Sequence, residues 1–195
     1  INADGKRVGG ILGSANTSHV AVGIKHCLNT GTITYTGTYA GVYRFFGGLV
    51  GATGDNTANP KTGSFTMDDC LNTGTVTVAS GSTNNAQGAI IGQGLGNVNI
   101  TNTYALDTST NNNKAIGNGS PTGTVGLSLK AFGALKGKSA KTNTDLDFEN
   151  YWSVVSGATP VLTTFATNDD NDDPDLNQAD TTWFDTATNS GTIET

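Results

Sequence analysis

Apolar residues in this chain occur in short clusters separated by glycine and by polar turn residues. Three clusters share one pattern of two small residues, two aliphatic residues and a glycine: "GGILG" from Gly9, "GGLVG" from Gly47 and "GAIIG" from Gly88. Glycine recurs at short intervals through the first two repeats, which disfavours long helices there. Short aliphatic runs bounded by Gly, Asn and Thr are typical of short strands and tight turns. The pattern therefore predicts an all-β fold.

A second strand-like block follows each cluster after a polar loop. The blocks read "IKHCLNTGTIT" from Ile24, "MDDCLNTGTVT" from Met67 and "ITNTYALDTS" from Ile100. One unit cannot bury its own apolar face, but stacked units can, and equivalent residues of successive coils then lie about 4.8 Å apart. We therefore expect a parallel β-solenoid (β-helix) of about three irregular repeats, in which Cys27 lies over Cys70.

Side-chain alternation within the first block assigns residues to two faces. Ile24, His26 and Leu28 are expected on one face, and Lys25, Cys27 and Asn29 on the other. Leu28 is expected over Leu71, with both side chains buried between adjacent coils. The residues expected to shape the stack are those at repeated positions: Gly9, Gly10, Gly47, Gly48, Cys27, Cys70, Asn29 and Asn72.

These motifs resemble the GLUG repeats of bacterial surface proteins. The resemblance covers about residues 7–126 and is weakest in the third copy, where Gly88-Ala89 and Thr103-Tyr104 replace Gly-Gly and Cys-Leu. It implies that "LSLKAFGALKG" from Leu127 and "FENYWSVVSGATPVL" from Phe148 form a short helix and a strand that cap the array. The expected segments are repeats over 1–126, a C-terminal cap over 127–167, an acidic linker over 168–178 and the start of another repeat-type domain over 179–195.

The same resemblance implies a non-catalytic stalk or adhesive module of a secreted or cell-surface bacterial protein. Such a module would bind a glycan or protein of a host or neighbouring cell, and its solenoid edges could join copies of the chain. Two alternatives stay open. One is a carbohydrate-active β-helix enzyme or an accessory segment of a surface protease, and the other is a subunit of an extracellular fibre.

Charge is distributed unevenly along the chain. The net charge is −6, but residues 168–195 contain eight acidic residues and no Lys or Arg, which leaves residues 1–167 at +2. No basic cluster indicates nucleic-acid binding. No apolar run approaches the roughly 20 residues of a membrane-spanning helix. The chain starts with Ile1 and shows no signal peptide, so we expect a piece of a longer, processed protein.

The sequence offers little for catalysis or for a cofactor. There is no Gly-x-Ser-x-Gly motif, and His19 and His26 are expected at solvated strand or loop positions. Asp68 and Asp69 are neighbours on opposite faces, which makes a poor acid/base pair. We therefore expect no catalytic residue, no cofactor and no enzyme activity.

The two cysteines are expected to be stacked core thiols, with a disulfide as the alternative. A metal site that combines His26, Cys27, Asp69 and Cys70 is disfavoured, because adjacent strand residues point to opposite faces. A further cation site is conceivable in the acidic stretch, where aspartates offer the oxygen ligands that calcium prefers. We expect a solvated linker there. The weaker alternative is a calcium site, for which the candidate ligands are Asp169, Asp170, Asp172, Asp173 and Asp175.

The most aromatic stretch, "YAGVYRFFGG", supplies the candidate ligand-binding residues. Exposed aromatic side chains and arginine are frequent anchors of bound partners. The alternative is that Phe46 and Tyr43 pack in the core. The candidates, all expected in an exposed loop, are Tyr39, Tyr43, Arg44 and Phe45.

Overall fold

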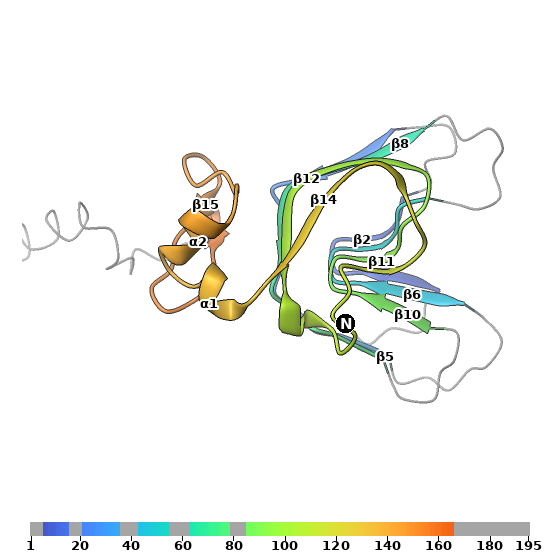
Figure 1. Ribbon diagram of the computed structural model, residues 1–195, viewed down its shortest axis with the longest axis horizontal. Coiled ribbons are helices and arrows are strands. Elements are labelled where there is room, and N and C mark those ends of the chain that lie inside the picture. The colour runs from blue at the N-terminus through green and yellow to red at the C-terminus, as the bar shows by residue number, and fades with distance from the viewer. Residues whose placement is uncertain (1–5, 16–20, 36–42, 55–62, 79–84, 166–195) are drawn as a thin grey trace, which may run out of the picture.

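The computed structural model describes residues 6–15, 21–35, 43–54, 63–78 and 85–165, and these form a parallel β-solenoid with a small cap beside it. Figure 1 looks along the direction in which the coils stack, so equivalent strands of successive coils overlap. The walls of the solenoid are parallel sheets to which successive coils contribute one strand each. The predicted fold class is therefore confirmed.

Two of these sheets contain the glycine-rich clusters. In the first, Gly47 lies in register between Gly9 and Gly88. In the second, Val50 lies in register between Leu12 and Ile91. The strands of the first sheet are β1 (Arg7–Gly9), β6 (Arg44–Gly47) and β10 (Asn85–Gly88), and those of the second are β2 (Leu12–Ser14), β7 (Val50–Ala52), β11 (Ile91–Gln93) and β13 (Ile116–Asn118).

The second strand-like block of each repeat forms the longest sheet, and a short strand pair follows it. Leu28 pairs with Leu71 and Asn29 with Asn72, as the repeated phrase predicted. The long sheet contains β3 (Val22–Lys25), β4 (Leu28–Asn29), β8 (Ser64–Asn72), β12 (Asn97–Leu106) and β14 (Thr122–Lys130), and the pair is β5 (Ile33–Tyr35) with β9 (Val76–Val78).

A left-handed residue turns each coil at the same place. His26, Asp69 and Asn102 have φ angles of 49°, 53° and 45°, a conformation that Asn and Asp tolerate best. Strands β8 and β12 bend there from one wall into the next (Figure 1). The turn breaks strict alternation, so Ile24 and Cys27 both pack against the core whereas Leu28 packs against the cap. The predicted assignment of faces was wrong in this respect.

Two apolar clusters fill the solenoid. The larger one lies between the β2/β7/β11/β13 sheet and the β3/β8/β12/β14 sheet and includes the fully buried Phe65, Met67 and Cys70. The smaller one joins Ile33, Tyr35, Phe46 and Val76 from the other two sheets. At about 25 cal/mol per Å² of buried apolar surface, these clusters supply the main stabilising term.

The glycines of the repeated cluster permit close approach of the two sheets that it forms. A Cβ atom on Gly47 would lie 2.0 Å from the carbonyl oxygen of Val50, and one on Gly92 would lie 2.6 Å from the backbone nitrogen of Phe46. No side chain fits at either distance. The chain therefore folds sharply between β6 and β7, and the same turn recurs between β10 and β11.

Asn29 and Asn72 form a ladder inside the stack. The Asn29 amide nitrogen donates to Asn72 Oδ1 (2.8 Å) and to the Gly48 carbonyl (2.9 Å), and the Asn72 amide nitrogen donates to the Ala89 carbonyl (2.8 Å). A Cβ atom on Gly48 would lie 2.1 Å from Asn72 Nδ2, so the second glycine of the cluster makes room for the amide. In the third coil, Ala105 replaces the asparagine and Ala89 replaces the glycine.

The cap lies beside the solenoid wall that contains the second half of β12 (Figure 1). Leu71 and Tyr104 of the wall pack with Leu135, Leu146 and Trp152 of the cap. The predicted helix and strand are two short helices and a two-stranded antiparallel hairpin. The remaining elements are η1 (Asp107–Ser109), α1 (Phe132–Leu135), α2 (Ser139–Asn143), β15 (Trp152–Ser153), β16 (Val161–Leu162) and η2 (Thr163–Phe165).

The solenoid extends beyond its predicted end. The predicted boundary between 126 and 127 falls within β14, which pairs with β12 as far as Lys130. Strands β13 and β14 thus form an incomplete further coil before the chain enters the cap. Leu127 and Leu129 belong to this coil and not to the predicted cap helix. Their side chains pack against the solenoid core.

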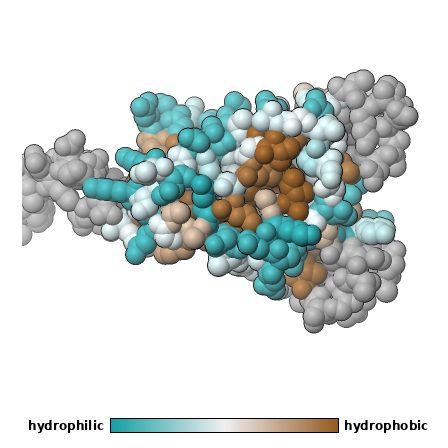
Figure 2. Space-filling model, viewed as in Figure 1, coloured by the Kyte–Doolittle hydropathy of each residue, from teal (hydrophilic) through white to brown (hydrophobic). Residues whose placement is uncertain are grey.

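Strands β13 and β14 are the outermost strands of their sheets, and the cap does not lie over them (Figure 1). The end-on view in Figure 2 shows an apolar area over this part of the solenoid. Val125 is 42 % exposed, and Ile116, Leu127 and Leu129 are partly buried. Within the described ranges, no helix has the length and apolar character needed to cross a membrane.

Candidate functional site

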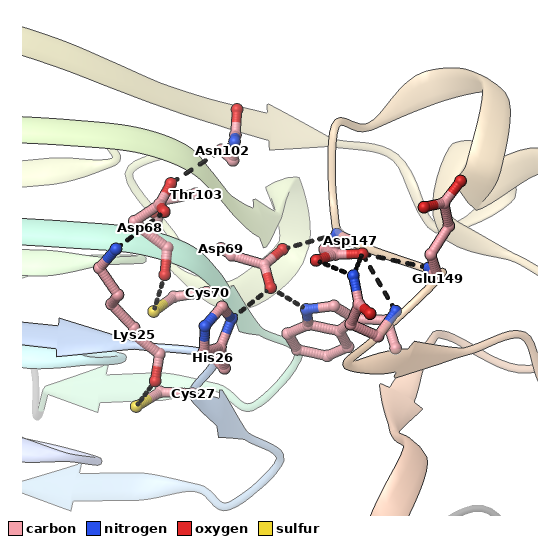
Figure 3. Close-up of polar contacts among 12 residues, drawn as sticks. Lys25, His26, Cys27, Asp68, Asp69, Cys70, Asn102, Thr103, Asp147 and Glu149 are labelled. Carbon is pink, nitrogen blue, oxygen red and sulfur yellow. Dashed lines mark hydrogen bonds and ion pairs between the residues drawn. The ribbon is translucent and has the colours of Figure 1, made fainter.

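The main polar cluster joins the solenoid to the cap and is centred on Asp69 (Figure 3). Asp69 lies at the left-handed turn of β8 and is buried. Its Oδ1 accepts a hydrogen bond from the backbone N–H of Asp147 (2.9 Å), and its Oδ2 accepts one from the indole N–H of Trp152 (2.8 Å). Both donors belong to the cap, so one carboxylate fixes the cap to the solenoid.

His26, from the coil before, completes the cluster. Its Nδ1 lies 2.7 Å from Asp69 Oδ2, and its ring stacks on Tyr151 at 3.6 Å between centroids. An ionised carboxylate accepts only, so Nδ1 carries the hydrogen in this contact. The prediction of a solvated strand or loop position was therefore wrong for His26, which is held on one side by Asp69 and on another by Tyr151.

A shallow pocket of about 470 Å³ opens beside this cluster. Its lining residues are His26, Asn150, Tyr151, Leu162, Thr163 and Thr164. A carboxylate-oriented imidazole beside a pocket is an arrangement that general-base catalysis also uses. Here, however, Asp69 also binds Trp152 and the backbone of Asp147, so the carboxylate acts as a structural cross-link whether or not the imidazole has a chemical task.

A second polar contact at the same junction involves Tyr104 and Asp145. The Asp145 backbone N–H donates to the Tyr104 hydroxyl (2.9 Å), and this hydroxyl donates to Asp145 Oδ2 (3.2 Å). Burial raises the pKa of Tyr104 above its ordinary value. On the cap side, Asn150 donates to the Asp147 carboxylate, and these bonds lower the pKa of Asp147. The junction is thus held by polar contacts from two coils.

The two cysteines occupy adjacent rungs and are free thiols. Cys70 is buried and Cys27 is partly buried, and each sulfur lies 3.1 Å from the carbonyl oxygen two residues earlier. A hydrogen bond from Cys70, helped by the nearby His26, lowers the pKa of Cys27 to about 7. The Cys27 thiol and burial raise the pKa of Cys70.

The disfavoured metal site is not assembled by the structure. His26 and Asp69 meet outside the solenoid wall, whereas Cys27 and Cys70 pack against the core inside it. No group of three or more His, Cys, Asp or Glu side chains with metal-binding geometry occurs in the described part of the chain. The five aspartates of the calcium candidate, from Asp169 to Asp175, lie outside the described residues.

The predicted ligand-binding residues do not form one exposed loop. Tyr43 is 64 % exposed, but Arg44 and Phe45 belong to β6 and are buried. Arg44 lies over the ring of Tyr35, at 5.1 Å from its centroid, and Phe46 is fully buried as the alternative interpretation required. Expected exposure was therefore wrong for Arg44 and Phe45, because the strand begins earlier than predicted. Tyr39 lies outside the described residues.

Sequence inspection missed the partners of Asp69. Trp152, Tyr151 and the backbone of Asp147 are distant in sequence from Asp69, and no spacing rule links them to it. One local signal was present, because Asp69 replaces the histidine of a phrase that otherwise differs only in Val76 for Ile33. This carboxylate accepts hydrogen bonds from two donors of the cap, Asp147 and Trp152.

Comparisons with known proteins add no relative from which function could be transferred. The likeness to GLUG repeats therefore depends on the quoted motifs and on the stacked parallel strands that they predicted. Searches against protein-family models, curated proteins and solved structures each found no match for this chain.

Proposed function

We propose that this chain is a non-catalytic structural and adhesive module of a secreted or cell-surface bacterial protein. It acts as a stiff stalk that presents ligand-binding surfaces. The observation that carries the proposal is the use of buried polar groups as cross-links between coils and between solenoid and cap. Asn29 and Asn72 connect successive coils, and Asp69 connects the stack to the cap.

Cross-links of this kind suit a mechanical role. A solenoid contacts only neighbouring coils, so its resistance to end-on separation depends on the interface between each pair. Buried amide ladders raise the cost of separating a pair, because each amide left unpaired costs about 1–3 kcal/mol. The expected partners of the module are glycans or proteins of a host or neighbouring cell.

Surface labelling tests the proposed location. Antibodies raised against the folded chain should label intact, unpermeabilised cells of the source bacterium, and deletion of the module from its parent protein should reduce attachment of those cells to host glycans or proteins. Labelling only after permeabilisation would contradict the proposal. A catalytic activity of the purified chain on polysaccharides, lost on His26→Ala, would favour the enzyme alternative instead.

Single-molecule stretching tests the mechanical part. The chain should unfold at a distinct force peak when it is pulled between its termini. Asn72→Ala should lower that force, and Phe132→Ala, which changes an exposed side chain on α1, should not. Extension without a force peak would contradict a stalk.

End-to-end association is a second candidate, favoured by the exposed apolar end of the stack. Strands β13 and β14 end their sheets, and Val125 is exposed there. Exposed strand edges with apolar side chains are frequent association sites. Sedimentation velocity should then show concentration-dependent oligomers that Val125→Lys removes. A monomer at every concentration would exclude this function.

A further inference from the structure

A pocket opens between two sheets of the solenoid on the side away from β8 and β12, and the space around it is called the groove. Its two walls are the β1/β6/β10 sheet and the β2/β7/β11/β13 sheet, which meet at the sharp turn between β6 and β7 and diverge from there (Figure 1). The groove contains a pocket of about 340 Å³. Its lining residues are Arg7, Tyr43, Phe45, Gln93 and Asn118.

Glycines set the depth of the groove. Gly51 and Gly92 of the second wall face the backbone of β1 and β6 so closely that a Cβ atom would lie about 2.5–2.6 Å from backbone nitrogens. The walls therefore touch at the bottom without side chains between them. Farther from the turn, Phe45 and Gln93 occupy opposite walls, and the pocket lies between them.

Gln93 is the feature that indicates a ligand. The side chain is 6 % exposed and lines the pocket, yet its Oε1 atom is buried without a hydrogen-bond partner among the described residues. A buried acceptor without a donor costs about 1–3 kcal/mol. Such a group persists in a binding site when the donor arrives with the ligand.

The other lining residues define the chemistry of that ligand. Tyr43 offers an exposed ring at the rim, and Phe45 forms an apolar surface below it. Asn118, which is exposed and in register with Gln93, adds a second amide. Aromatic faces that flank amide groups match a molecule with one apolar face and several hydroxyl groups, which describes a pyranose ring.

We propose that this groove binds one hexose or N-acetylhexosamine unit of a glycan. A sugar hydroxyl donates to Gln93 Oε1, the apolar face of the ring packs on Tyr43, and Asn118 contacts a second hydroxyl or the acetamido group. The volume matches one sugar unit, since pockets for small molecules begin at about 300 Å³. This inference rests on the proposed adhesive function and assigns it a site.

Solution NMR of the complete, isotope-labelled chain tests the assignment directly. Glucose, galactose, mannose and N-acetylglucosamine are added separately at about 0.1 M, where even a ligand with millimolar affinity saturates its site. At least one sugar should shift the side-chain amide signals of Gln93 and Asn118 and the ring signals of Tyr43. Signals from the pocket near His26 and Tyr151 should not move.

Two variants separate binding from folding. Tyr43→Ala changes an exposed side chain and should weaken binding about tenfold without unfolding the chain. Gln93→Leu should abolish the shifts and at the same time keep or raise the melting temperature, because it removes an unpartnered acceptor. A purely structural glutamine would instead lower the melting temperature and leave binding intact.

The control is Phe132→Ala, which removes an exposed aromatic side chain from α1, outside the groove, and should leave binding unchanged. The proposal is overturned if none of the four sugars shifts groove signals, or if Tyr43→Ala binds as the wild type does. Surface labelling and stretching do not depend on these NMR signals. Absence of sugar binding would therefore leave the proposed stalk function intact. Failure of the labelling or stretching experiment would leave the sugar-binding result intact.

Discussion

The asparagine ladder and the Asp69 junction both bury polar side chains, but they recruit their partners in different ways. In the ladder, Asn29 binds the residue at the same position of the next coil. At the junction, Asp69 binds Trp152 and Asp147, which belong to another part of the fold. The ladder is a property of the repeat, whereas the Asp69 contacts to the cap occur at one coil and help to fix the cap to the stack.

The equivalent positions of the three coils show what the junction adds. His26, Asp69 and Asn102 share the left-handed backbone, so the turn itself needs none of these side chains in particular. Of the three, only Asp69 has two carboxylate oxygens, which accept hydrogen bonds from the backbone N–H of Asp147 and the indole N–H of Trp152. The repeat therefore sets the backbone conformation of all three turns, and the side chain at one of them, Asp69, determines which coil binds the cap.

Removal of the junction carboxylate should have the largest effect. Asp69→Ala leaves the Trp152 indole N–H and the Asp147 backbone N–H without acceptors and should destabilise the chain by about 4 kcal/mol in urea unfolding. Asn102→Ala, at the equivalent left-handed turn, should cost about 1 kcal/mol, from backbone strain and the loss of one long hydrogen bond to Asp68. Equal costs at the two turns would mean that Asp69 does not hold the cap.

Removal of the inner rung of the ladder should cost somewhat less. Asn72→Ala deletes the acceptor for Asn29 and the donors to Ala89 and Gly74, and we expect a loss of about 3 kcal/mol. Asn29→Ala, at the outer rung, should cost about half as much, because Asn72 keeps its own bonds to Ala89 and Gly74. A larger loss at Asn29 than at Asn72 would reverse this order.

Extension of the ladder into the third coil is a sharper test with a smaller effect. Ala105→Asn alone should destabilise the chain, because Ala89 occupies the space that the glycine leaves in the coils before. Ala105→Asn combined with Ala89→Gly should recover stability, with a coupling of about 1–2 kcal/mol in a double-mutant cycle. Additive changes would show that glycine and asparagine are not linked.

The smallest expected effect on stability concerns the two cysteines, Cys27 and Cys70, but these thiols should differ clearly in their rate of alkylation. Because the pKa of Cys27 is lowered to about 7, its alkylation by iodoacetamide should rise with pH around 7, and Cys70 should react far more slowly since it is buried. A folded-state pKa below the ordinary value means that the Cys27 thiolate adds stability at alkaline pH, and this is lost as the pH falls through about 7. Mass spectrometry of both peptides measures the rates, and equal rates would contradict the environment assigned to Cys27.

Repeated residues made much of the fold predictable. The duplicated phrase correctly placed Leu28 beside Leu71 and Asn29 beside Asn72, because identical coils stack in register. The faces of that phrase were not predictable, since the left-handed turn at His26 shifts the alternation by one residue. The exposure of Arg44 and Phe45 was mispredicted for a related reason: the loop before them ends earlier than its composition indicated.

The candidate sites were less predictable, because they depend on contacts that no repeat encodes. Tyr43 was identified as an exposed aromatic residue, but Gln93 and Asn118, which line the same groove, come from other coils and carry no local signal. Trp152 was recognised only as part of a cap. Its indole N–H reaches Asp69 only because the cap packs sideways on the wall that contains Leu71 and Tyr104.

By itself, the sequence determined a parallel β-solenoid, since glycine-flanked aliphatic strands that repeat with the same residues can bury their apolar faces only by stacking. It also determined which residues stack on their equivalents. The tertiary structure alone decided which of those residues face the core, the cap or the groove. The physical reason is that a backbone turn at one residue redirects every side chain after it, and that contacts across walls depend on how the sheets and the cap pack, not on the period of the chain.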